Sequence, residues 1–73
     1  MEFTIRFTWY DDDNIWVASA VDNDKFGLTL DHGSFDGLLE LVKIAIPDLI
    51  DDYKGDVRLI IDVDKVVDMK VGV

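Results

Sequence analysis

The sequence predicts an α+β fold with the element order strand, strand, strand, helix, strand. Three observations favour this order: apolar and polar residues alternate at the start of the chain, apolar residues with helical spacing occupy the middle, and alternation returns in the last third. A length of 73 residues suffices for one domain, so we expect residues 1–73 to form a single unit.

The first two strands form a predicted hairpin. Residues 3–9 alternate between apolar and polar side chains, which is typical of a half-buried strand. Residues 11–14, Asp-Asp-Asp-Asn, are predicted to turn the chain, because such side chains bond nearby backbone amides. Residues 15–21 are rich in β-forming residues and are predicted to be the second strand.

A second turn is expected at residues 22–25 and a third strand at residues 26–30, closed by His32 and Gly33. The segment that begins at residue 22 starts like a calcium-binding loop. Phe26, however, occupies its fifth position, where an oxygen ligand is needed, and Gly33 replaces the glutamate of its twelfth. We therefore interpret the aspartates as turn residues and expect no metal site.

The helix is the most clearly predicted element. Ser34 is a plausible N-cap, Asp36 complements the helix dipole, and the apolar stripe runs from residue 35 to residue 53, before Gly55 ends the helix. Pro47 interrupts this stripe and leaves two alternatives: it begins a new short turn, or it lies in a kinked continuous helix.

Alternation continues from residue 57 to residue 73 almost without a break. A hairpin at residues 64–65 would place Ile61 opposite Asp68, which is a poor match. One long strand fits better, although two strands remain the alternative. Such a strand would extend beyond the earlier ones and would tend to pair with another copy of the chain.

The composition excludes several functional classes. With 7 basic and 16 acidic residues, the net charge of −9 argues against nucleic-acid binding and against docking on an anionic membrane. The chain has no cysteine and no visible secretory signal or membrane segment, so we expect a complete cytoplasmic protein.

Catalytic residues are scarce. Ser34 is explained as a helix cap, Ser19 lies on a strand, and the single histidine, His32, has no orienting partner in the sequence. The five glycines are scattered and form no phosphate-binding loop. We therefore expect no enzyme and no catalytic, cofactor-binding or metal-ligating residues; a small metal- or ligand-binding enzyme that uses the aspartate turns is the least favoured hypothesis.

An interaction surface is the remaining kind of site. Most aromatic residues are expected in the core. If one is exposed, we expect it to be Tyr10 or Trp16, at the end of the hairpin, where it would serve a protein interface. Two further apolar residues lie off the helix stripe, and others lie on the overhanging end of the last strand. The predicted interface residues are Tyr10, Trp16, Leu41, Ile44, Val67, Met69 and Val71.

Several segments together carry a family resemblance: Trp9 with the acidic turn 11–14, Trp16-Val17-Ala18, Gly27-Leu28, Ser34, Leu38-Leu39 and residues 46–50. Over residues 3–50 the chain resembles the HicB-like family, whose better-known members are antitoxins of HicA toxins. It is most similar to short, stand-alone members of unassigned function.

The resemblance implies a partial ribonuclease-H-like fold: a three-stranded antiparallel meander, one helix across one face, and the last strand beside the first. It implies no nuclease, because ribonuclease-H chemistry needs a carboxylate in the middle of the first strand and residues 3–9 contain none. The chain departs from HicB antitoxins in having Phe26 before Gly27, where they usually have proline, and in ending at Val73 without their DNA-binding segment. Autorepression is therefore not expected.

We therefore expect a non-catalytic protein-interaction module that resembles HicB antitoxins and binds and neutralises a small basic HicA-type ribonuclease. Acidic charge would accelerate the capture of such a partner. The alternative is a self-assembling domain, a homodimer or higher oligomer, in which the last strand together with Leu41 and Ile44 pairs the chains.

Overall fold

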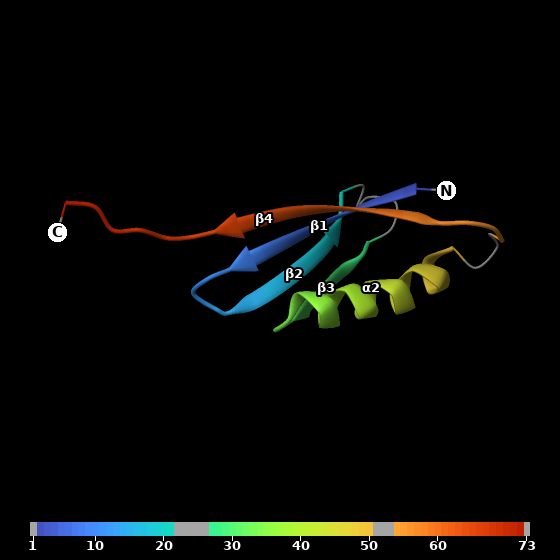
Figure 1. The fold of residues 1–73 in the computed structure, drawn as a ribbon, viewed down its shortest axis with the longest axis horizontal. Helices are drawn as coiled ribbons and strands as arrows, with labels where there is room; N and C mark the ends of the chain where they lie inside the picture. Colours follow the sequence, from blue (N-terminus) through green and yellow to red (C-terminus); the bar gives the residue numbers. More distant parts are fainter. Residues whose placement is uncertain (1, 22–26, 51–53, 73) are drawn as a thin grey trace.

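The computed structural model describes residues 2–21, 27–50 and 54–72 and has the expected α+β architecture (Figure 1). Its elements are β1 (Glu2–Tyr10), β2 (Ile15–Ala20), β3 (Thr29–His32), α2 (Phe35–Leu49) and β4 (Arg58–Val66). The strands form one sheet in the order β3-β2-β1-β4. Strand β2 is antiparallel to both β1 and β3, and β4 is parallel to β1. The predicted meander and the placement of the last strand beside the first are confirmed.

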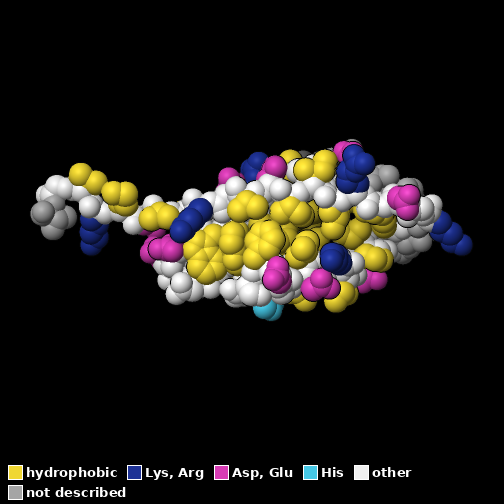
Figure 2. Space-filling model, in the orientation of Figure 1, with side chains coloured by type: hydrophobic (Ala, Val, Ile, Leu, Met, Phe, Trp, Pro, Cys, Tyr) yellow, Lys and Arg dark blue, Asp and Glu magenta, His cyan; other side chains and the backbone are white. Residues whose placement is uncertain are grey.

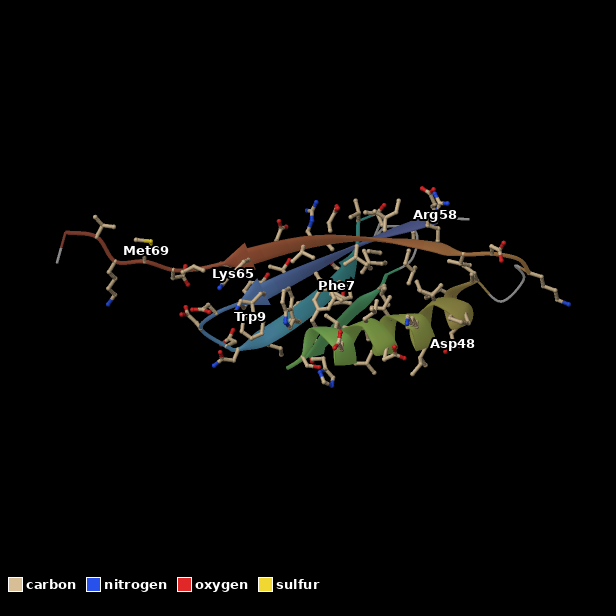
Figure 3. The ribbon with its side chains drawn as sticks, in the orientation of Figure 1. Phe7, Trp9, Asp48, Arg58, Lys65 and Met69 are labelled. Carbon is tan, nitrogen blue, oxygen red and sulfur yellow. The ribbon has the colours of Figure 1, made fainter. Side chains whose placement is uncertain are left out.

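The core lies between one face of the sheet and α2. Alternation along β1 buries every second residue, and the fully buried Phe7 points from the sheet toward the helix (Figure 3). Ala18 opposes Phe7 on β2, where its small side chain leaves room for the ring. The helix buries Leu38, Val42 and Ile46, one residue per turn, on the face that meets the sheet.

The sequence predicted the start of α2 correctly but not its end. The Ser34 hydroxyl accepts a hydrogen bond from the Gly37 N–H at 2.9 Å, which confirms the N-cap. Pro47 lies inside a continuous helix. The helix ends at Leu49 rather than near Gly55, because Ile50 leaves the helical conformation and its N–H bonds the Pro47 carbonyl instead. Among the described residues, no helix has the length and apolar character needed to cross a membrane.

Two predicted strands have different bounds in the structure. The third strand was expected at residues 26–30 and lies at Thr29–His32, because it pairs with Trp16–Ser19 of β2. His32 is thus the last residue of a strand. Residues 22–26, which include the predicted second turn, lie outside the described part of the chain, as does Tyr53 of the predicted helix stripe.

Strand β4 is a single strand, and the alternative hairpin at residues 64–65 does not form. It ends at Val66 rather than continuing to residue 73, because its partner β1 ends at Tyr10, which is opposite Val66. Residues 67–72, here called the C-terminal tail, continue away from the sheet (Figure 1).

Candidate functional site

The predicted interface residues lie in four separate places. Trp16 is on the helix side of the sheet. Tyr10 lies on the opposite side, where it pairs with Ile15 and Val66. The remaining residues are on the outer face of α2, where Leu41 is 37% and Ile44 68% exposed, and on the tail, which carries Val67, Met69 and Val71. They do not form one continuous surface.

A chain of four aromatic rings runs from the core to the end of the β1–β2 hairpin. The ring centroids of Phe7 and Phe35 are 4.9 Å apart, those of Phe35 and Trp16 5.1 Å, and those of Trp16 and Trp9 5.3 Å. All three contacts are tilted or edge-to-face, which are favourable arrangements for aromatic pairs. Phe7 is fully buried, whereas Trp9 and Trp16 are half-buried, so the chain holds two indole rings at the surface.

These two indoles form the wall of an open hollow of about 440 Å³, here called the aromatic hollow, which is lined by Trp9, Asp11, Trp16 and Lys65. The Trp9 indole N–H donates a hydrogen bond to the Asp11 carboxylate at 3.2 Å. Lys65 is opposite Trp9 in the β1–β4 register and lies near it (Figure 3). The hollow therefore combines an aromatic wall with one carboxylate and one ammonium group.

Trp9 was not among the predicted surface residues, although its indole is half-buried and lines the hollow. The signal was present, because a four-residue turn between residues 10 and 15 places Trp9 opposite Trp16. Cross-strand neighbours on one face are within contact distance of each other. Their side chains share the helix side of the sheet, beyond the first turn of α2.

Negative charge surrounds this end of the molecule. Asp11, Asp12 and Asp13 form the turn, in which Asn14 adopts a left-handed backbone conformation with φ of 51°. The Asp68 side chain hydrogen-bonds the Asp12 carboxyl group, and the charge of Asp68 repels the ionised form, so the pKa of Asp12 is raised above 3.8. The tail thus begins beside the acidic turn.

Arg6 forms ion pairs with two carboxylates on the opposite face of the sheet. Arg6 contacts the carboxylate of Asp64 at 3.3 Å and that of Asp62 at 3.9 Å. All three side chains are half-exposed, so these pairs add little to stability. They nevertheless offset acidic charge on this face.

A second hollow, of about 520 Å³, lies between the end of α2 and the start of β4. Its lining is mostly apolar and consists of Lys43, Ile46, Pro47, Ile50, Lys54, Gly55, Val57 and Leu59. Figure 2 shows apolar side chains gathered along the flank between α2 and β4. The two lysines make this hollow less suited to a basic ligand than the aromatic hollow.

The residues considered for catalysis have structural contacts. The Nδ1 atom of His32 accepts a hydrogen bond from the Ser34 N–H at 2.9 Å, so the imidazole supports the start of α2. Within the described ranges, no three histidine, aspartate or glutamate side chains are grouped so that they could hold a metal ion. The first five positions of the calcium-loop-like segment, residues 22–26, lie outside the described part of the chain.

Comparison with known proteins identifies a family for this chain. The model of a family described as a domain of unknown function (DUF1902) matches residues 2–69, which includes all the strands, the helix and the first residues of the tail. No curated protein and no solved structure matches the chain.

Proposed function

Because the chain belongs to the DUF1902 family, a domain of unknown function, we propose its function from the site itself: a non-catalytic module that binds a small basic protein at the aromatic hollow. One observation carries the proposal. Trp9, Asp11 and Trp16, which line the hollow, are also among the residues that give the sequence its likeness to HicB antitoxins. This likeness indicates a HicA-type ribonuclease as the partner.

The chemistry of the hollow suits a cationic side chain of the partner. An arginine guanidinium stacks on an indole face, and a carboxylate beside the indole supplies a charge-assisted hydrogen bond. Trp9 and Trp16 offer the ring surface, and Asp11 lies within hydrogen-bond distance of the Trp9 indole N–H. Tryptophan and arginine are the residue types that contribute most to binding energy at protein interfaces.

Neutralisation follows from the charge of the two proteins. A ribonuclease must hold phosphate groups with basic side chains, so its RNA-binding surface is positive. The acidic turn beside the hollow would cover that surface, and the net charge of −9 would steer the two proteins together.

The proposal is tested by co-expressing this chain with the product of its adjacent gene where that product is small and basic, as a HicA-type ribonuclease is. We expect the two proteins to co-purify, to form a complex by size-exclusion chromatography with light scattering, and to show ribonuclease activity that falls as this chain is added. Trp9→Ala should weaken the complex, whereas Ile44→Asp, on the outer face of α2, should leave it intact. A basic neighbour that stays separate and fully active would refute the proposal.

A further inference from the structure

The C-terminal tail has the pattern of a β-strand without a neighbouring strand. Val67, Met69 and Val71 are 53%, 78% and 85% exposed, and Asp68, Lys70 and Gly72 alternate with them. The backbone of residues 67–72 has no hydrogen bond to the described part of the chain. Such a segment gains hydrogen bonds and buries apolar surface when it pairs with another strand.

The outer edge of β4 offers matching hydrogen-bonding groups. Strand β4 is an edge strand of the sheet, and among the described residues only β1 pairs with it. The Val66 carbonyl accepts a hydrogen bond from the Asp11 N–H, so even-numbered residues direct their backbone groups toward β1. Successive residues of a strand alternate in this direction, and those of Val63 and Lys65 therefore point outward.

The sequence of this edge is complementary to itself. When two copies pair antiparallel about Val67, Val67 opposes its counterpart, Lys65 opposes Met69, and Val63 opposes Val71. These odd-numbered positions all direct their backbone groups toward the other copy. On the other face, Asp64 opposes Lys70, and twofold symmetry forms this pair of opposite charges twice.

Neighbouring registers are less favourable. Centring the pair on Lys65 or Asp68 places that residue opposite its own copy, and centring it on Val66 places Asp64 opposite Asp68. Directly opposed like charges destabilise a strand pair. A register centred on Met69 avoids opposed like charges. It pairs only residues 66–72 of the described chain, however, whereas the register centred on Val67 pairs residues 62–72.

We propose that two copies of this chain associate through residues 62–72, which pair antiparallel about a twofold axis at Val67. The tail of each copy then covers the outer edge of β4 of the other. Val63 is 57% exposed although it lies on the helix side of the sheet, and Val71 of the second copy covers it. Met69 of the second copy lies beside Lys65, at the rim of the aromatic hollow.

The register is tested directly by disulfide cross-linking, because the natural chain has no cysteine. Opposed residues at hydrogen-bonded positions have Cα atoms about 5.5 Å apart, within reach of a disulfide. We expect Val67→Cys to form a covalent dimer rapidly under mild oxidation. In Val71→Cys, the most exposed of the three positions, the two cysteines would be about 27 Å apart and should stay reduced.

Equal cross-linking of the two variants would indicate random collision and would overturn the proposal. Met69→Cys distinguishes the shorter register, in which that position would cross-link instead. Non-reducing electrophoresis at low protein concentration measures all three.

Charge exchange tests the same dimer without an added cysteine. Light scattering should give a twofold mass for the full chain, and Lys70→Asp or Asp64→Lys should each weaken association about tenfold. The double variant should restore it, whereas Asp62→Lys with Lys70→Asp should not, because Asp62 opposes Gly72 in this register. A monomer at every concentration, or a dimer abolished only by Ile44→Asp, would contradict the proposal.

Discussion

Trp9 and Trp16 show how single residues build the candidate site. The two residues face each other across β1 and β2 because of the turn at residues 11–14. In this turn Asn14 adopts the left-handed backbone conformation that closes the hairpin. The sequence predicted this turn and named Tyr10 or Trp16 as the exposed aromatic residue; Tyr10 is exposed, whereas Trp16 is half-buried. It did not predict the chain of rings through Phe35, because that contact joins the hairpin to a helix that begins far along the chain.

The shared hydrogen bond of Asp12 and Asp68 predicts a pH dependence. Because the pKa of Asp12 is raised in the folded chain, folding favours the protonated form. The stabilising contribution is fully present below the ordinary value of 3.8 and is lost as the pH rises through the raised folded-state pKa. Carboxyl NMR should show an Asp12 midpoint above 3.8.

Two variants check this cause. Asp68→Asn should lower the Asp12 midpoint toward its ordinary value, because it removes the carboxylate that accepts the hydrogen bond of the protonated Asp12 and that repels its ionised form. Asp62→Asn, on the face of the sheet opposite α2, should leave it unchanged. An Asp12 midpoint that does not respond to Asp68→Asn would mean that the tail does not begin at the acidic turn.

At the scale of elements, the sequence predicted those features of the helix and strands that depend on neighbouring residues. The hairpin, the N-cap at Ser34 and the single last strand follow from alternation, capping and spacing. The bounds of β3 depend on its pairing with β2, and the end of β4 depends on its pairing with β1. The sequence pattern does not show where these pairs of strands begin and end. The end of α2 depends on a hydrogen bond to the Pro47 carbonyl, whereas the apolar stripe continues beyond it.

The start of α2 gives a second prediction. A Cβ atom on Gly37 would overlap the His32 ring, which would have to swing away and lose its hydrogen bond from the Ser34 N–H. Alanine otherwise favours a helix over glycine by about 1 kcal/mol. Gly37→Ala should therefore be nearly neutral in the natural chain and stabilising by about 1 kcal/mol in a His32→Ala background.

Urea unfolding followed by tryptophan fluorescence measures this coupling. Gly33→Ala, which has open space around its Cβ position, is the matched control and should show no coupling to His32. Additive effects of Gly37→Ala and His32→Ala would contradict the contact between the histidine and the helix.

At the scale of the whole molecule, the net charge can be counted from the sequence, whereas the arrangement of the charges depends on the fold. Asp11 of the acidic turn lines the aromatic hollow, while Asp62 and Asp64 pair with Arg6 on the other face of the sheet. The fold also directs the tail away from the body, along the longest dimension of 56 Å (Figure 1). The proposed binding surface at the hollow and the proposed dimer contact of the tail meet at Lys65.

A comparison of Asp11→Asn with Asp31→Asn tests most directly whether the partner binds at the aromatic hollow. Both variants remove one negative charge, but Asp11 lines the aromatic hollow, whereas Asp31 lies on the face opposite α2, beside Val17. The measurement is the dissociation constant for the proposed partner, a small basic ribonuclease, determined at one fixed salt concentration.

We predict about tenfold weaker binding for Asp11→Asn, because a charge-assisted hydrogen bond is lost, and little change for Asp31→Asn. Equal effects of the two substitutions would show that net charge alone attracts the partner and would contradict binding at the aromatic hollow.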